Sequence, residues 1–255
     1  SLVDYNRAGI ALCEIVSKPD IRTGKEASEY ASEIRRTVRY LGVSDGNMQE
    51  GSLRCDVNIS VRKGPNAPFG TKVEIKNMNS FSAIQKACDY EIARQIEVYE
   101  NGGEIFQETR LWDEAKQLTK SMRLKEGSSD YRYFPDPDLG PIEITKAQKE
   151  IWFKELPELP SKKRNKYVSE FGLSAYDARV ISDEINMANF FEETVANGAE
   201  AKLASNWVTS DIVGYLKANK LSFSELKLSP ENLAEMINMI SKNTISGKIA
   251  KEILP

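Results

Sequence analysis

The chain of 255 residues contains no histidine. This absence excludes, within the chain, nucleophilic catalysis by Ser-His or Cys-His pairs and zinc sites built on imidazole. A metal ion would have to be held by oxygen ligands, which favours magnesium. Long apolar runs are missing as well: no stretch approaches the roughly 18 residues of a membrane span, so we expect no membrane among the partners.

Cysteine is scarce. The three cysteines, Cys13, Cys55 and Cys88, are scattered and odd in number, and each stands at an apolar-patterned position. They are interpreted as reduced core residues of a cytoplasmic protein. No secretory signal is visible, and the chain opens on Ser1 in what looks like the middle of a motif, so we expect a fragment of a longer protein. The net charge of −3 restricts nucleic-acid binding to local basic patches.

Strand patterns are confined to the first part of the chain. Residues 53–61 and 72–76 alternate between apolar and polar side chains, and a Gly/Pro-rich turn joins them, which predicts an antiparallel hairpin. Further short strands are expected at residues 10–16, 105–112 and 119–125.

Two helices are predicted between these strands. Thr23 and Glu26 form a capping box for the first helix, which Gly42 ends. The second helix starts from a cap at Asn79 or Ser80. Its expected apolar stripe consists of Phe81, Ile84, Cys88, Ile92, Ile96 and Tyr99.

After Ile144 the strand signals stop and helical periodicity continues to the end. Ser229 caps one of these helices and Pro230 takes its first position, while Ile249 and Ile253 are expected on the apolar face of the last one. We place a domain boundary near residue 145. The predicted class is α+β: a mixed or antiparallel sheet portion over residues 1–145, followed by an all-α helical bundle over residues 146–255.

Glu14 stands out because it falls inside the apolar strand predicted at residues 10–16. Burying an isolated carboxylate is costly, so a positive group must face it, either a basic side chain or a metal ion. From the residues alone an ion pair is the more common arrangement.

The polar face of the predicted hairpin carries both charge signs at two-residue spacing. Its members are Arg54, Asp56, Asn58, Lys72, Glu74 and Lys76. Cross-strand ion pairs on a solvated sheet would explain this face, each contributing roughly 0.2–1 kcal/mol. Phosphoryl transfer needs the same groups, with basic side chains for phosphate oxygens and carboxylates for magnesium. The pattern alone does not decide between the two.

Two other segments carry charge. A stiff, aromatic-rich loop over residues 126–138 could cover the core or form the wall of a site, with Arg123 and Arg132 facing an anion. A basic cluster follows Pro160 and comprises Lys162, Lys163, Arg164 and Lys166. It is typical of a solvated helix start, and it could also contact nucleic-acid phosphates. No Walker-type loop or dinucleotide fingerprint is present.

Several sequence blocks occur together and in order through the first 145 residues. They are Asp4–Arg7, Leu12–Asp20, Glu50–Asn58, Lys76–Phe81, Gly102–Glu104, Gln107–Arg110 and Asp130–Asp138. In this set the chain resembles the B subunit of glutamyl/aspartyl-tRNA amidotransferase. The helical part is similar in type and position, although its match is weaker.

The resemblance implies a ligase subunit that uses ATP and Mg²⁺ to phosphorylate the side-chain carboxylate of Glu or Asp mischarged on tRNA. Ammonia then displaces the phosphate. It also implies a heterotrimer in the cytoplasm, with an amidase-type glutaminase subunit that supplies ammonia and a small clamp subunit. The alternative is a non-catalytic module that scaffolds tRNA and the partner subunits.

Site residues follow from the resemblance and from the hairpin face together. Glu14 matches a magnesium ligand of the family. From the hairpin face we predict catalytic roles for Arg54, Asp56 and Glu74, with Asp56 or Glu74 as an outer partner of the metal. Contacts to ATP phosphates are expected from Lys72, Lys76, Arg123 and Arg132, and tRNA contacts from Lys162, Lys163, Arg164 and Lys166. The family's first half, with further metal ligands including a histidine, and its tail domain are absent, so we expect the fragment alone to be inactive.

Overall fold

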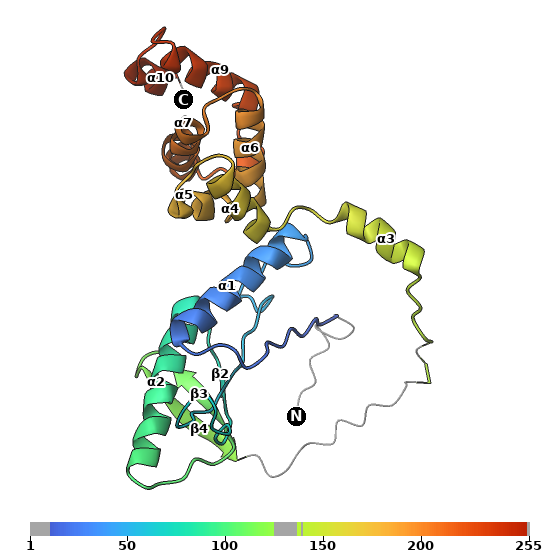
Figure 1. Cartoon of the computed structure of the whole chain (residues 1–255), viewed down its shortest axis with the longest axis vertical. Coiled ribbons are helices and arrows are strands. Elements are labelled where there is room, and N and C mark those ends of the chain that lie inside the picture. Colours follow the sequence, from blue (N-terminus) through green and yellow to red (C-terminus); the bar gives the residue numbers. More distant parts are fainter. Residues whose placement is uncertain (1–10, 125–136, 139, 254–255) are drawn as a thin grey trace. The chain divides into compact units, whose positions relative to one another are not determined.

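The computed structural model describes residues 11–124, 137–138 and 140–253. It confirms the α+β class, with a four-stranded sheet and many helices (Figure 1). Among these residues, no helix has both the length and the apolar character needed to cross a bilayer. Contacts divide the chain into two compact units, Ser1–Ala31 with Cys55–Ser128, and Ser32–Arg54 with Ser129–Pro255. The domain boundary near residue 145 stays a prediction.

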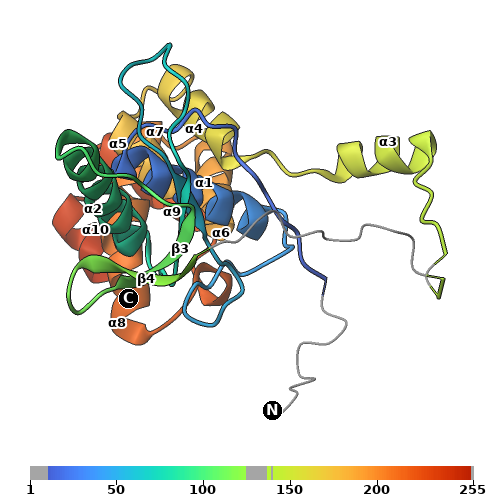
Figure 2. The ribbon, with the colours of Figure 1, turned by 90° about the horizontal axis from the view of Figure 1, so that it is seen from below.

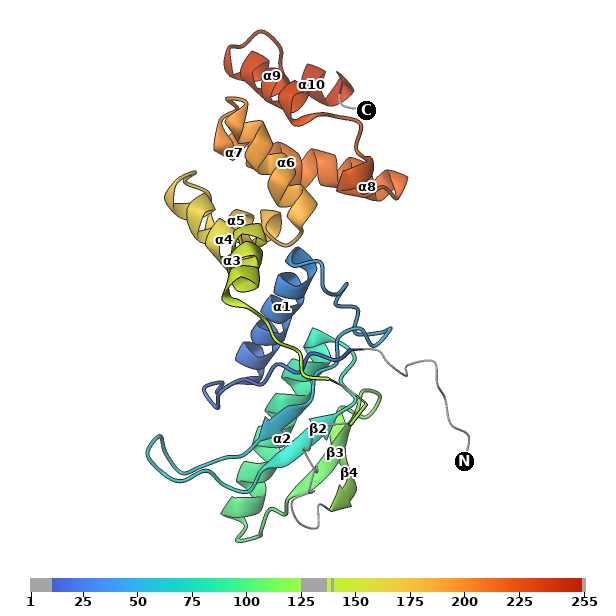
Figure 3. The ribbon, with the colours of Figure 1, turned by 90° about the vertical axis from the view of Figure 1, so that its right-hand side faces the viewer.

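The sheet of the first unit is mixed. Its strands are β1 (Val57–Ile59), β2 (Val73–Lys76), β3 (Glu108–Asp113) and β4 (Leu118–Leu124), in the order β1-β2-β3-β4. The predicted hairpin is confirmed, because β1 pairs antiparallel with β2. Strand β2 pairs parallel with β3, and β3 pairs antiparallel with β4 (Figure 3).

Helix α2 (Phe81–Glu100) connects the two parallel strands, which need a crossover, and it packs on one face of the sheet (Figure 3). The Ser80 side chain caps it by accepting a hydrogen bond from the Ala83 N–H, as predicted. Between helix and sheet lies an apolar core that includes Ile59, Val73, Ile75, Ile84, Ala87, Cys88 and Trp112. The opposite face of the sheet therefore remains for polar side chains.

Helix α1 (Gly24–Tyr40) begins at the predicted capping box. The Glu26 N–H donates to Thr23 Oγ1 at 3.1 Å, and the Thr23 N–H donates to Glu26 Oε2 at 3.2 Å. Gly42 ends the helix with a φ of 66°, a value that glycine adopts without strain. The first residue, Gly24, donates its N–H to Asp89 Oδ1 on α2 at 3.2 Å.

This close approach predicts a strong effect of Gly24→Ala. An added Cβ would lie 2.4 Å from Asp89 Oδ1 and 2.4 Å from the Gln85 carbonyl oxygen, which is backbone and cannot rotate away. We expect a loss of about 1–3 kcal/mol in unfolding free energy, measured by chemical denaturation. The matched variant Gly214→Ala meets nothing within 4 Å in helix α8 (Val213–Asn219) and should stabilise by about 0.5–1 kcal/mol. Equal effects of the two substitutions would contradict the packing argument.

The second unit contains the helical region and the C-terminal part of α1. Its remaining helices are α3 (Lys146–Glu155), α4 (Pro160–Ser169), α5 (Ala175–Ile181), α6 (Ile185–Ala196), α7 (Ala201–Asn206), a π-helical turn (Trp207–Ile212), α8, a 3-10 turn (Phe223–Glu225), α9 (Pro230–Ser241) and α10 (Gly247–Ile253). The core includes Tyr167, Phe191, Leu233 and Ile237. Helix α3 has no buried residue, and an extended segment separates it from α4 (Figures 1 and 2).

Three sequence expectations are wrong. Residues 11–16 form no strand, and Cys13 is exposed, because this segment joins none of the strands of the described sheet. On α2 the buried face turns away from Ile96, which is 43% exposed, and continues through Glu91 and Gln95. On α10 the buried residue is Ala250, whereas Ile249 and Ile253 are exposed, since only the small side chain faces the core.

Candidate functional site

The structure brings three predicted site residues together on the sheet face opposite α2. Lys76 Nζ donates to Asp56 Oδ2 at 2.8 Å and lies 3.7 Å from Glu74 Oε1. Thr109 of β3 joins them, because its hydroxyl donates to Glu74 Oε2 at 2.9 Å. We call Asp56, Glu74, Lys76 and Thr109 the polar face. Strand alternation explains it, since Glu74 and Lys76 stand two residues apart and Glu74 is the register partner of Thr109.

The charged side chains of the polar face are partly open to solvent, whereas Thr109 is buried, with 1% of its surface exposed. The side chains of Lys76 and Asp56 are 39% and 47% exposed, and that of Glu74 is 17% exposed. The hydrogen bond to Asp56, followed by the charges of Asp56 and Glu74, raises the pKa of Lys76 and outweighs its partial burial. An ammonium group has three donors, so a cation held by two carboxylates can still reach a third anion, such as a phosphate oxygen.

The remaining residues of the predicted hairpin face do not belong to the polar face. Asn58 is exposed on β1, opposite Glu74 in the register, and Lys72 is exposed at the residue before β2. Arg54 is exposed and belongs to the second compact unit, so the structure does not assign it to the polar face. The catalytic and phosphate-binding roles of these residues stay predictions.

The predicted environment of Glu14 is wrong. Glu14 is exposed in an irregular segment, so no desolvation forces a cation onto it. Among the described residues, no group of three or more His, Cys, Asp or Glu side chains could hold a metal ion. On the polar face the Lys76 ammonium already occupies the position between Asp56 and Glu74. The described residues by themselves therefore do not fit a Mg²⁺ site.

The aromatic loop lies largely outside the described residues, and with it Arg132. Arg123 is in β4, where its Cα is the register partner of Thr109, and its side chain is also outside the description. The backbone thus places position 123 one strand beyond Thr109, but the predicted phosphate contacts of both arginines remain untested.

The basic side chains of the cluster on α4 form ion pairs with carboxylates of the same chain. Lys163 is 5% exposed and its Nζ lies 2.5 Å from Glu192 Oε2, while Lys166 Nζ lies 3.7 Å from the other oxygen of Glu192. Arg164 pairs with Glu33 at 2.7 Å. Lys162, 78% exposed at its side chain, lies 3.4 Å from Glu158. Of the predicted tRNA contacts, the one at Lys162 has the most accessible side chain.

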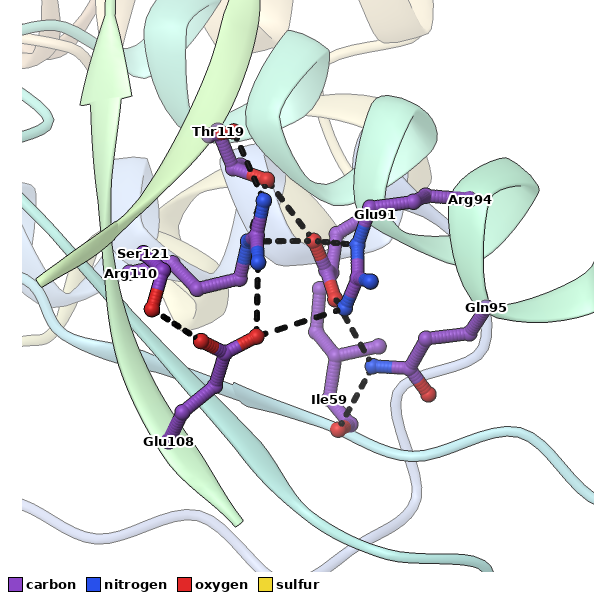
Figure 4. Close-up of polar contacts among 8 residues, drawn as sticks. All are labelled: Ile59, Glu91, Arg94, Gln95, Glu108, Arg110, Thr119 and Ser121. Atoms are coloured by element: carbon purple, nitrogen blue, oxygen red, sulfur yellow. Dashed lines mark hydrogen bonds and ion pairs between the residues drawn. The ribbon is translucent and has the colours of Figure 1, made fainter. Parts of the chain in front are cut away.

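Sequence reasoning missed a buried charge network on the other face of the sheet (Figure 4). Glu91 of α2 is fully buried and binds Arg94 through both oxygens, at 2.6 and 3.0 Å. Arg110 of β3 lies 3.6 Å from Glu91 and donates to Glu108 at 2.6 Å, while Arg94 lies 3.9 Å from Glu108. We call Glu91, Arg94, Glu108 and Arg110 the buried ion cluster; its two carboxylates balance two guanidinium groups.

Hydrogen bonds extend the buried ion cluster into β4. Arg110 donates to the hydroxyl and the carbonyl oxygen of Thr119, both at 2.8 Å, and the Thr119 hydroxyl donates to Glu91 at 2.9 Å. The Ser121 hydroxyl donates to Glu108 (Figure 4). Burial raises the pKa of Glu108, but the hydrogen bonds from Ser121 and Arg110 lower it more. The pKa of this carboxyl group therefore lies below its usual value.

Two sequence signals could have indicated this cluster. Glu91 and Gln95 continue, at helical spacing, the face that Ile84 and Cys88 begin. The Gln95 amide donates to Glu91 at 3.0 Å and to the Ile59 carbonyl oxygen at 3.3 Å, so these polar residues are buried with partners. The block Gln107–Arg110 also alternates acid and base along one strand face.

Comparisons with known proteins agree with the sequence blocks. The family described as the GatB/GatE catalytic domain matches residues 1–150, and the family described as the GatB domain matches residues 189–255. Curated relatives that are named as B subunits of aspartyl/glutamyl-tRNA(Asn/Gln) amidotransferase align over the whole chain. They are 98% identical in Prochlorococcus marinus strain MIT 9312, 89% in subspecies pastoris and 72% in Synechococcus strain CC9605.

The chain spans 52% of the length of each of these relatives. The family match nevertheless covers more than half of the chain itself and includes both the polar face and the buried ion cluster. The chain therefore belongs to the GatB/GatE catalytic-domain family.

Proposed function

We propose that this chain is part of a subunit of an ATP-dependent aminoacyl-tRNA amidotransferase and carries residues that take part in the reaction. The relatives are named as B subunits of aspartyl/glutamyl-tRNA(Asn/Gln) amidotransferase. The observation that carries the proposal is the polar face, where Lys76 lies between Asp56 and Glu74 within the residues that match the family. A charged, partly exposed surface of this kind suits the handling of phosphate groups.

The proposed reaction converts a poor acyl donor into a good one. The side-chain carboxylate of mischarged Glu-tRNA or Asp-tRNA attacks the terminal phosphate of ATP, which gives an acyl phosphate and ADP. Ammonia then attacks the carbonyl carbon and phosphate leaves, so the amide remains. In this scheme Lys76 neutralises phosphate oxygens at the end of β2, and Lys72 supplies a second positive charge from the residue before β2. The two carboxylates of the polar face orient the Lys76 ammonium group.

The cofactors of this proposal are ATP and Mg²⁺. Magnesium would neutralise phosphate charge when bound. Since the described residues do not form its site, we assign no step to the cation and propose that Glu14, which is exposed, joins ligands from outside this chain. The phosphate contacts of Arg123 and Arg132 and the role of Arg54 belong to the same proposal.

The proposed partners are an amidase-type glutaminase subunit, a small clamp subunit and the mischarged tRNA, in the cytoplasm. Residues 1–145 would form the part that carries out the reaction, and residues 146–255 a helical domain. Within that domain Lys162 is the member of the basic cluster best placed to contact RNA phosphates, because its side chain is 78% exposed.

An amidation assay with Glu14→Lys tests the proposal against a purely scaffolding role. The substitution is made in the full-length protein assembled with its partners, and Glu-tRNA and Asp-tRNA are each assayed with and without ATP and Mg²⁺. We expect ATP-dependent amide formation by the parent enzyme, its loss in Glu14→Lys and unchanged tRNA binding. Because Glu14 is exposed, the fold should tolerate the change. Full activity of the variant would instead favour a module that only binds tRNA and partner subunits.

A further inference from the structure

The buried ion cluster is poorly explained by stability alone. Glu91 is fully buried, and the side chains of Glu108 and Arg110 are 10% and 13% exposed. Desolvating such charges costs about as much free energy as their attraction returns, and apolar residues of similar volume often stabilise a fold equally well. A set of paired charges instead fixes the relative positions of its side chains, because each hydrogen bond constrains both a distance and a direction.

The cluster holds β3 on both sides of a single residue. Glu108 and Arg110 point toward α2 (Figure 4). Thr109 between them contacts Glu74 on the opposite face, as strand alternation requires. There the Thr109 hydroxyl donates to Glu74, which lies beside Lys76. The two flanking anchors therefore set the position of a group that contacts the polar face.

The pairing of β3 with β4 is irregular next to Thr109. The register between β3 and β4 shifts between Thr109 and Arg110, so the regular ladder of hydrogen bonds is interrupted. Arg110 binds Thr119 and Glu108 binds Ser121, so side chains connect the two strands next to the irregularity. The extra residue at this irregularity, Met122, lies on β4, and the contacts of Arg110 and Glu108 with β4 hold β3 in place beside it.

We propose that Arg110 and Glu108 are positioning residues for the polar face, acting through Thr109 on Glu74 and Lys76. This inference rests on the proposed function, since it assigns the polar face to the reaction. It predicts that the cluster and Thr109 form one functional unit: once the Thr109 hydroxyl is gone, the anchors beneath it have nothing left to position.

A double-mutant cycle in the assembled enzyme tests this. Thr109→Val removes the hydroxyl at nearly constant volume, and Arg110→Met removes the guanidinium. We expect each single variant to lower kcat by about tenfold or more, and the double variant to be no slower than the slower single one. Thr109→Ser, which keeps the hydroxyl, should retain the parent kcat. Multiplied effects in the double variant, or a parent-like kcat of Thr109→Val, would overturn the inference.

Two further variants keep the result interpretable. If Arg110→Met does not fold, as judged by circular dichroism, Glu108→Gln replaces it in the cycle with the same expectation. Lys76→Ala separates the inference from the proposed function. A parent-like rate of Lys76→Ala would remove the polar face from the reaction, whereas an inactive Lys76→Ala combined with a parent-like Thr109→Val would refute the positioning role alone.

Discussion

Lys76→Ala in the assembled enzyme is expected to lower kcat/KM for ATP-dependent amidation by about 10²–10³-fold, the usual cost of removing one group that stabilises developing charge. In the structure this ammonium lies 2.8 Å from Asp56 and 3.7 Å from Glu74. Without it, two carboxylates remain on a surface that should receive phosphate, so the face changes from attracting to repelling its ligand.

The fold should survive this change, because partly exposed ion pairs contribute only about 0–1 kcal/mol. Thermal unfolding of the variant measures that directly. Lys86→Ala is the matched control: Lys86 also pairs with a carboxylate, Glu114 at 3.7 Å, but it lies on α2, away from the polar face, and should leave the rate unchanged. A double variant Lys72→Ala/Lys76→Ala that retains the full rate would show that the polar face is only solvated surface.

The largest expected effect on stability belongs to Glu91→Ala. We expect it to lower the free energy of unfolding of the 255-residue chain by about 3–5 kcal/mol, as measured by chemical denaturation. The substitution removes a fully buried carboxylate and leaves Arg94 and Arg110 with Glu108 as their shared counter-charge. The Thr119 hydroxyl loses its acceptor at the same time, and the Gln95 amide loses one of its two acceptors.

Glu97→Ala is the control on the same helix, because Glu97 is exposed; its effect should stay within about 0.5 kcal/mol. Glu91→Gln should fall between the two variants, since the amide oxygen can still accept a hydrogen bond from Thr119. A small effect of Glu91→Ala would mean that the buried ion cluster is less important for the fold of the first unit than its burial suggests.

Local sequence patterns were sufficient to predict those features whose structure is determined by residues close in sequence. The capping box of Thr23 and Glu26, the cap at Ser80 and the hairpin of β1 and β2 were predicted and are confirmed. Each depends on contacts within one turn or between adjacent strands, where side-chain type and spacing decide the geometry. The charges of the polar face were found for the same reason, since they lie on consecutive strands.

Glu14 and Glu91 were misjudged for opposite reasons. Glu14 was expected to be buried because apolar residues surround it in sequence, yet Leu12 and Val16 are themselves 78% and 79% exposed. Glu91 was missed because a charged residue in a helix is usually solvated. Burial depends on what packs against a residue, and neither its sequence neighbours nor its own polarity gives that information.

The sequence by itself determined the α+β class, the family and the candidate residues Asp56, Glu74 and Lys76, because blocks and alternation are local properties of a chain. Only the tertiary structure decided that β2 and β3 pair in parallel, so that Thr109 meets Glu74, and that β3 carries Arg110 beneath it to Glu91 on α2. Those pairings join residues far apart in sequence, and their distances result from packing rather than from any local preference.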